Sequence, residues 1–453
     1  MRRRRHRPGR RILAPATTAA LAAALLVAAP APASAAPLTL SNFQLRPNAY
    51  GTDLLERADD IPMVKATVTQ IMGDLNRRRD PGDGPAVTIG GACNPAAVGT
   101  GVSIRRSICF NEGDNETTEW YPQGVTSVAD MQADQQWGDS PQQLIVSWYD
   151  RNGGTGGQRG VRISFVDRAT GAYRHVLLVY PKRSGDTIDY ESVRVSQDPQ
   201  SGDYGKALHA GGILWYGDHL FVADTARGFR VFDMRRIYDL GASENGTTKD
   251  ESKVGLVGDT YHAHAYRYIM PQVGSWTRTA ATGDKCTEND GSPNFSYVSL
   301  DRSGADHLLA GEYCHSDHAV NGRVAAWPMA GAFDADGEPV MDPGYRWNAD
   351  AAHNLPDSNI QGATRFNDRW YLTRSRGITG LGTFYTTRPV TSSTGTLSIA
   401  GHKPISKGPE DLSHWPGILD DPTLGEMWTV AEHPGSDEDG TGQGQRMLYA
   451  WAP

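Results

Sequence analysis

The sequence is poor in cysteine, and this shortage narrows the kinds of site that it can build. Only four of its 453 residues are cysteine, and no two have the Cys-x-x-Cys spacing typical of zinc sites. In an oxidising compartment four cysteines suggest two disulfides. Of three connectivities, nearest-neighbour pairing predicts Cys93 with Cys109 and Cys286 with Cys314.

Apolar runs long enough to span a bilayer are also missing, so we expect no membrane-spanning segment. The short apolar stretch at residues 21–29 follows a basic start and precedes the small residues Ala33, Ser34 and Ala35. This arrangement is typical of a secretory signal peptide. We therefore expect residues 1–35 to be removed and the mature protein to be secreted and extracellular.

Positive charge is scarce in the expected mature chain. Seven of the 44 basic residues and none of the 52 acidic residues lie in positions 1–35, which leaves a formal charge of −15. Nucleic acid or an anionic membrane would require a basic stripe, so we expect neither as a partner. A neutral or cationic ligand is easier to accommodate, and we expect a monomer.

Helical periodicity is almost absent, and short apolar segments recur instead. Five units each contain a strand, a tight polar turn, a second strand and then a third strand. Their first strands begin at Gln123, Gly211, Ser296, Gln361 and Glu410. Since no low-complexity linker divides the chain, the repeats predict an all-β fold, a single β-propeller of about five four-stranded blades over residues 121–453.

The spacing of the units leaves the blade count open. The steps between first strands are 88, 85, 65 and 49 residues, whereas an ordinary blade needs roughly 40 to 50. Six or seven blades are the alternative. We favour five, because the surplus residues at 241–255 and 279–293 are polar and lack alternation, as in loops.

The last unit ends after three strands, which would leave an open sheet edge. We expect a strand from the N-terminal extension, residues 36–120, to close the propeller. The two candidates are residues 38–45 (LTLSNFQL) and residues 102–110 (VSIRRSICF). The best helical stretch, residues 63–79, predicts a short helix on the outside.

In a propeller the starts of the first strands and the ends of the second strands converge on one face, around a central funnel. The polar residues at these positions have the composition of a binding or catalytic pocket. The candidates are Gln123, His209, Asn294, Gln361, Glu410, Asp224, Arg227, Glu312, His315, Arg374, Arg376, Glu432 and His433.

Three of these residues are catalytic candidates. His209 precedes two glycines that permit close approach to the backbone, and an imidazole transfers protons near neutral pH. Glu410 could act as acid or base, or with Asp411 hold calcium in the channel. Glu312 is the third candidate. The structural alternatives are a histidine merely hydrogen-bonded in the channel and a glutamate that shapes a turn.

Four residues are candidates for substrate binding. Arg227 and Arg374 could bind an acidic group through paired hydrogen bonds, or only pair with nearby glutamates. Gln123 and Gln361 could bind hydroxyl groups. We assign no metal site, because the histidines of YHAHAYRY, residues 261–268, lead into an outer strand.

Two segments carry a resemblance to known proteins. HAGGILWYGDHLFVADTARGFRVFDM, from His209, and GPEDLSHW, from Gly408, resemble secreted bacterial propeller proteins that are mostly of unassigned function. The first segment is also similar to the His-x-Gly-Gly-Ile segment of propeller polysaccharide lyases. Those enzymes tend to use a second histidine where this sequence has residues 228–230, Gly-Phe-Arg.

Five-bladed glycoside hydrolases resemble the chain in fold. Their first blade usually opens with a catalytic aspartate, and the equivalent place here is Gln123, an amide that is neither nucleophile nor base. An acid pair would then have to come from Asp224, Glu312, Glu410 and Glu432.

These observations predict an extracellular carbohydrate-active protein that binds a polysaccharide or oligosaccharide in the funnel. If it is an enzyme, the resemblances imply a polysaccharide lyase or a glycoside hydrolase. The alternative is a non-catalytic propeller that binds a glycan or protein through exposed aromatic residues such as Trp120, Trp215 and Trp276.

Overall fold

The computed structural model describes residues 38–48, 52–137, 142–151, 159–280, 286, 291–417, 425–434 and 446–453. The expected signal peptide, residues 1–35, lies outside these ranges, as does most of the predicted loop at 279–293. No helix in the described ranges has the length and apolar character needed to cross a membrane.

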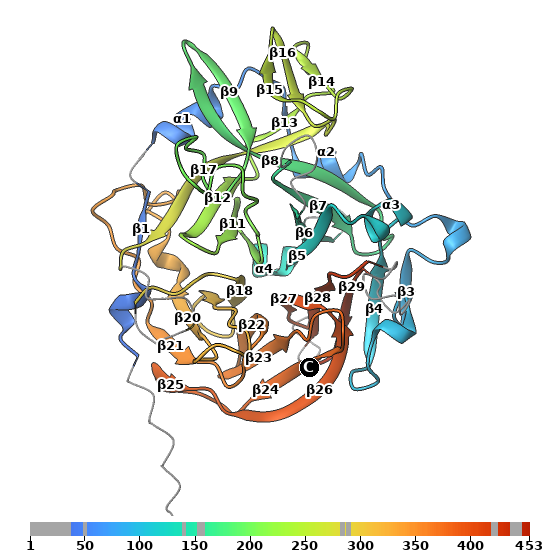
Figure 1. The fold of residues 1–453 in the computed structure, drawn as a ribbon, viewed down its shortest axis with the longest axis vertical. Coiled ribbons are helices and arrows are strands. Elements are labelled where there is room, and N and C mark those ends of the chain that lie inside the picture. The colour runs from blue at the N-terminus through green and yellow to red at the C-terminus, as the bar shows by residue number, and fades with distance from the viewer. Residues whose placement is uncertain are drawn as a thin grey trace, which may run out of the picture. The chain divides into compact units, whose positions relative to one another are not determined.

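Antiparallel pairing groups most of the described strands into five units of four (Figure 1). The first three are β5 (Trp120–Ser127), β6 (Gln143–Asp150), β7 (Val161–Asp167) and β8 (Tyr173–Ser184); β10 (Ile213–Tyr216), β11 (His219–Asp224), β12 (Gly228–Asp233) and β17 (Tyr268–Arg278); and β18 (Tyr297–Asp301), β19 (His307–Gly311), β20 (Arg323–Pro328) and β21 (Ala351–Asn354). The others are β22 (Ile360–Phe366), β23 (Arg369–Arg374), β24 (Leu381–Thr387) and β26 (Ile399–Lys407); and β27 (Pro409–Trp415), β28 (Glu426–Ala431), β29 (Met447–Trp451) and β4 (Ile104–Cys109).

The first strands of the units, β5, β10, β18, β22 and β27, contact one another at the centre, and the other strands follow outward (Figure 1). Inner strands are covered on both faces by neighbouring units. Every residue of β5, β11 and β27 is therefore buried, and these strands lack the alternation of a half-exposed sheet. The protein is an all-β propeller, as the repeats predicted.

The last unit is closed by β4, which pairs with β29 from Cys109 opposite Met447 to Ile104 opposite Trp451. The prediction that residues 102–110 close the propeller is confirmed, and the alternative, residues 38–45, is wrong. That segment ends in β1 (Leu45–Pro47), which pairs with β17 of the second unit. Its side chains Phe43 and Leu45 pack in the apolar cluster of the second and third units instead.

Both predicted disulfides are present, between Cys93 and Cys109 and between Cys286 and Cys314. Cys109 is the last residue of the closing strand β4. The first disulfide therefore ties the closing strand to residues that precede it. Disulfides persist in oxidising compartments, which agrees with an extracellular protein.

Replacing Cys93 with alanine tests the contribution of this disulfide. Cys93 is half-buried, so the substitution leaves the buried Cys109 and the packing of β4 in place. The disulfide spans 16 residues, and closing a loop of that size stabilises a fold by about 3 kcal/mol. We expect urea denaturation to show a loss of about that size. An unchanged free energy of unfolding, with free thiol detected by titration, would contradict it.

Several elements extend the units. Strand β9 (Thr187–Ser192) pairs antiparallel with the end of β8, β25 (Thr394–Thr396) pairs with β21, and β3 (Val87–Ile89) pairs with β4. The predicted loop at 241–255 is partly wrong, because β14 (Gly246–Thr247) and β15 (Val254–Val257) form a small sheet with β16 (Thr260–Ala263). Burial of residues such as Tyr261 against Tyr190 stabilises that sheet.

The N-terminal extension carries short helices. The predicted helix at 63–79 is only α2 (Val68–Met72), because Lys65–Ala66 forms β2 against β13 (Ile237–Asp239) and Thr67 caps the helix. The extension also contains the helices α1 (Asp53–Asp59) and α3 (Glu112–Glu116) and the 3-10 turns η1 (Leu40–Phe43), η2 (Pro81–Asp83) and η3 (Pro95–Ala97). Two further short elements of the described chain lie within the propeller: α4 (Val128–Met131) follows β5, and the 3-10 turn η4 (Met329–Gly331) follows β20.

Candidate functional site

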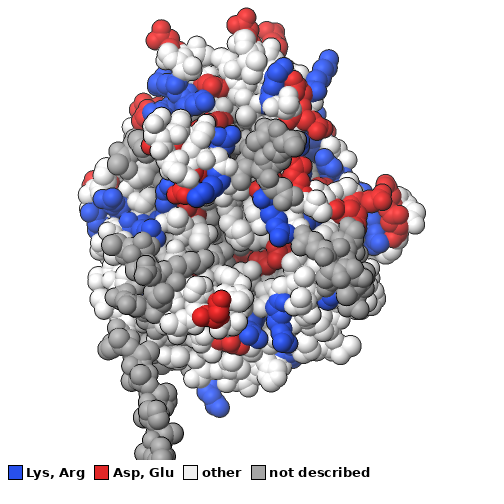
Figure 2. Space-filling model, in the orientation of Figure 1, with Lys and Arg blue, Asp and Glu red and all other residues white. Residues whose placement is uncertain are grey.

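Two glutamates from the last unit meet at the funnel. Glu410 lies in β27 and Glu432 follows β28, and acidic side chains are visible near the middle of the face shown in Figure 2. Burial, and then the charge and hydrogen bond of Glu432, raise the pKa of Glu410 well above its usual value. A raised pKa favours the protonated form of Glu410, and in that form its carboxyl group can donate to Glu432. We call these two residues the carboxyl pair.

Amides from two other units bind the carboxyl pair. Gln361 Nε2 of β22 donates to Glu410 Oε1 at 3.1 Å, and Gln123 Nε2 of β5 donates to Glu432 Oε2 at 2.8 Å. Gln123 is fully buried, and its Oε1 accepts no hydrogen bond from the described residues. The structure thus brings together four of the residues selected from the sequence: Gln123, Gln361, Glu410 and Glu432.

Two tyrosines lie beside the carboxyl pair. Burial and the neighbouring charges of the pair raise the pKa of Tyr149 and of Tyr313. Tyr149 is the last but one residue of β6, and its ring centroid lies 4.7 Å from that of His209. Asn359, two residues before Gln361, donates to the Tyr313 hydroxyl at 2.9 Å. His209 therefore joins the site through Tyr149, and all five units contribute side chains.

A buried cation lies behind Glu432. Arg446 is fully buried, and its Nε donates to the backbone oxygen of Glu432 at 2.7 Å. Its guanidinium carbon lies 4.5 Å from the ring centroid of Tyr121. Burial lowers the pKa of Arg446 to about 10, so the group remains charged at neutral pH. This charge partly balances that of the carboxyl pair.

The neighbouring Asp411 has a structural position. It is fully buried, and its Oδ2 accepts from the backbone N–H groups of Val125 at 3.3 Å and Ile213 at 3.2 Å. It thereby joins the first strands of three units. Its Oδ1 accepts no hydrogen bond from the described residues, and a calcium ion held by Glu410 and Asp411 stays a prediction.

Glu312 forms a closed ion pair. Its two oxygens accept from Arg323 Nε at 2.8 Å and from Arg323 Nη2 at 2.9 Å, and both residues are buried. The backbone N–H groups of Asn294 and Arg323 also donate to the carboxylate, each at 3.0 Å. With its acceptor sites filled, Glu312 is suited to holding β19 and β20 together rather than to proton transfer.

The two predicted substrate arginines contact other groups. Arg227 lines a separate cavity of about 400 Å³, where it donates to the backbone oxygen of Val195 and lies 3.8 Å from Asp224. Arg374 donates to the backbone oxygen of Ser358 at 3.1 Å and lies 3.2 Å from Asp357. None of these contacts joins either arginine to the carboxyl pair.

The prediction that Trp120, Trp215 and Trp276 are exposed is wrong, since they are 3%, 0% and 1% exposed. Each packs in an apolar cluster between strands. Trp120 and Trp215 lie on the inner strands β5 and β10, which are covered on both faces, whereas Trp276 lies on the outer strand β17 and packs against Trp347.

The selection from sequence missed Tyr149, Tyr313 and Arg446. Tyr149 lies one residue before the end of the second strand of the first unit, whereas the residues selected in the other units lie at or beyond that end. Tyr313 directly follows Glu312, and adjacent residues of an extended chain point to opposite sides. The sequence selection therefore took Glu312, whose side chain pairs with Arg323, and passed over Tyr313, the next residue, which lies beside the carboxyl pair. No sequence signal indicated Arg446.

Comparisons with known proteins assign no family: no family model and no curated protein matches the chain. Among solved structures it is similar to the RS223 β-xylosidase, with 9% identity, a TM-score of 0.30, and coverage of 76% of this chain and 94% of that one. It is also similar to the PQQ-bound aldose sugar dehydrogenase of Streptomyces coelicolor, with 13% identity, a TM-score of 0.28, and coverage of 75% of this chain and 96% of that one. A third similar structure is the Cps50 (Swd1) propeller domain of Myceliophteria thermophila, with 9% identity, a TM-score of 0.31, and coverage of 75% of this chain and 99% of that one. Likeness at this level carries no argument about function.

Proposed function

We propose that the protein is an extracellular carbohydrate-active propeller that binds a glycan over the carboxyl pair. One observation carries the proposal: side chains from all five units converge there, and they combine tyrosines with amides and carboxyl groups. Tyrosine rings pack against the apolar faces of sugars, and amides and carboxyl groups bind hydroxyls. The buried Gln123 Oε1, which lacks a described donor, fits a hydroxyl or amine.

The charge of the site favours neutral or amine-bearing sugars over acidic ones. The carboxyl pair supplies the negative charge, and its cation, Arg446, is buried behind it. Arg227 and Arg374, which were to bind an acidic group, contact other residues. A uronate polymer would therefore meet a carboxylate without a matched cation.

Replacing Tyr149 with alanine tests the binding site. We expect wild-type protein to bind one or more members of a panel of neutral and amine-bearing glycans by calorimetry. The substitution should weaken that binding about 10-fold or more, since an anchoring aromatic side chain contributes about 2 kcal/mol.

The control is Tyr204→Ala, which changes an exposed tyrosine in the loop after β9. This variant should bind as the wild type does. Equal binding by both variants, with unchanged thermal unfolding, would contradict a glycan site over the carboxyl pair.

Proton transfer to the bound glycan is a second candidate function, favoured by the proton that Glu410 holds next to Glu432 and close to the Tyr149–His209 contact. Hydrolysis fits poorly, because hydrolases place their two carboxyl groups roughly 5 to 9.5 Å apart, whereas these two are hydrogen-bonded. Elimination would need a proton acidified by a neighbouring carboxyl group, which one member of the pair removes while the other protonates the leaving glycosidic oxygen. A uronate-containing glycan added to the panel should then yield unsaturated sugar ends, and His209→Ala should slow their formation on the order of 10²-fold.

A further inference from the structure

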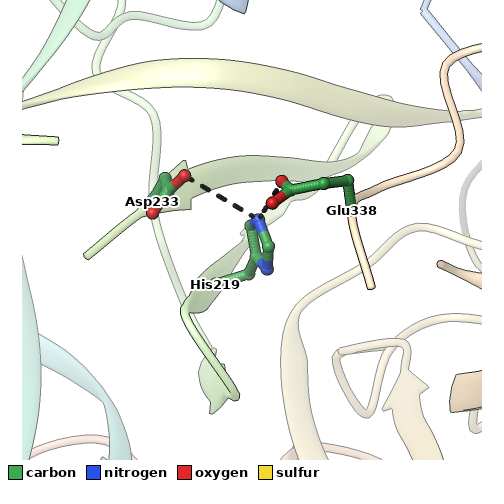
Figure 3. A group of neighbouring side chains, drawn as sticks. All are labelled: His219, Asp233 and Glu338. Atoms are coloured by element: carbon green, nitrogen blue, oxygen red, sulfur yellow. Dashed lines mark ion pairs between the residues drawn. The ribbon is translucent and has the colours of Figure 1, made fainter. Parts of the chain in front are cut away.

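Three side chains with metal-binding atoms meet between the second and third units: His219, Asp233 and Glu338 (Figure 3). His219 begins β11 and Asp233 ends β12, and the two residues are directly paired across these strands. Glu338 comes from the turn after η4, where its backbone oxygen accepts from Asp334 N–H at 2.9 Å. Because this corner lies at the start of β11, it is remote from the funnel, where second strands end.

The imidazole of His219 is the buried centre of this cluster. It is 3% exposed, and its Nε2 has no hydrogen-bond partner among the described residues. That nitrogen points between Asp233 Oδ2, 4.0 Å away, and Glu338 Oε2, 3.8 Å away (Figure 3). Both distances exceed a hydrogen bond. A buried nitrogen left unpaired costs stability unless something fills the space between these atoms.

A neutral imidazole offers a lone pair at this nitrogen, as metal coordination requires, and the two carboxylate oxygens beside it supply negative charge.

We propose that His219, Asp233 and Glu338 bind a divalent transition-metal ion, with Zn²⁺ as the best-matched ion. One imidazole nitrogen and two carboxylate oxygens form an N/O donor set that suits Zn²⁺, which binds such atoms at about 2.0 to 2.2 Å. Tetrahedral ligands at that radius are roughly 3.4 Å apart. The ligand atoms now lie within 4.8 Å of one another and must approach to bind the ion. The half-exposed Glu338 can move, and water completes the fourth position.

Arg235 competes with the ion for the same oxygens. Its Nη2 donates to Asp233 Oδ2 and to Glu338 Oε2, each at 2.8 Å, and Arg236 Nη1 also donates to Asp233 Oδ2, so two guanidinium groups now neutralise the two carboxylates. The Arg235 side chain is 42% exposed, and Asp218 Oδ2 lies 3.7 Å from its Nε. Metal binding therefore requires Arg235 to turn away from the cluster, and Asp218 offers it an alternative partner.

The competition between Arg235 and the ion gives a sharp test. The full chain, free of affinity-tag histidines, is titrated with Zn²⁺ by competition against a chromophoric chelator, and Co²⁺ is used as a spectroscopic probe. We expect one ion per chain and a raised Tm. His219→Ala should weaken binding at least about 100-fold, and Arg235→Gln should tighten it about 10-fold. Tighter binding on removing an arginine is not expected of adventitious surface binding.

Glu338→Gln is the control against misfolding, since Glu338 lies on a half-exposed turn. It should weaken binding about 10-fold without changing the unfolding of the metal-free protein. Absence of Zn²⁺ binding by the wild type, or equal binding by the wild type and both ligand variants, would overturn the proposal. Weaker binding by Arg235→Gln would also overturn it, because Arg235 would then support the site.

Discussion

Replacing Glu410 with glutamine is expected to remove a pH-dependent loss of stability that the wild-type protein shows above about pH 4.5. Glu410 has a raised pKa in the folded protein, so between the unfolded value and the folded value the native state holds one more proton than the unfolded state. The stability contributed by that proton is complete below the unfolded pKa and is lost as the pH rises through the folded pKa. The slope is about 1.4 kcal/mol per pH unit.

Glutamine matches the neutral acid in shape and in hydrogen bonding. Its oxygen can accept from Gln361, and its N–H can donate to Glu432, as Glu410 does now. Urea denaturation at pH 5, 6, 7 and 8 should therefore show the variant gaining on the wild type by about 1.4 kcal/mol for each unit within that window. Asp411 and Asp130, whose pKa values burial also raises, affect both proteins equally.

The matched control is Asp60→Asn, because Asp60 forms an exposed ion pair with Arg183. That variant should follow the wild-type pH dependence, since exposed pairs contribute about 0 to 1 kcal/mol. If Glu410→Gln also follows it, Glu410 is ionised in the folded protein and the carboxyl pair holds no proton. The proton-transfer function would then lose its basis, whereas glycan binding would be unaffected.

Replacing Glu312 with methionine is expected to cause the largest loss of stability among these variants, about 3 to 5 kcal/mol in urea denaturation. The substitution leaves Arg323 buried without its carboxylate, together with the backbone N–H of Asn294 that now donates to Glu312. A buried charge without its partner is penalised far more than the intact pair contributes.

The double variant Glu312→Met with Arg323→Met separates the cost of an unpaired charge from the cost of lost packing. It should be more stable than Glu312→Met alone, because neither charge remains. Folded Glu312→Met should also keep wild-type glycan affinity, since the contacts of Glu312 lie with Arg323 and not with the carboxyl pair. A variant of normal stability that had lost activity would instead support the catalytic role expected from the sequence.

The repeats in the sequence predicted much of the fold, because each unit is built from local turn and strand signals. The starts of the first strands and both disulfides are readable from patterns within a few dozen residues. The closing strand was narrowed only to residues 38–45 or 102–110, because its pairing with β29 joins distant parts of the chain. The helix at 63–79 was overestimated, since pairing of β2 with β13 overrides local helical preference. The small sheet of β14, β15 and β16 was missed because its strands are only two to four residues long.

The candidate site was predictable only in part. Gln123, Gln361 and Glu410 were selected because inner strand starts must meet at one face, and the structure brings them together. Their roles relative to one another were not predictable. Glu312 and Tyr313 are adjacent, so their side chains point to opposite faces of the strand. The exact end of β19 determines which of them faces the funnel, and a shift of one residue exchanges the two faces.

By itself the sequence determined the propeller, because strand and turn signals act over short distances and repeat along the chain. Only the tertiary structure decided which polar side chains share a proton, form a closed ion pair or surround His219. Those properties depend on burial and on atoms that approach within a few ångströms from distant parts of the chain, as Gln123 and Glu432 do across 309 residues. Desolvation and charge act at that range, and the linear order of residues does not specify it.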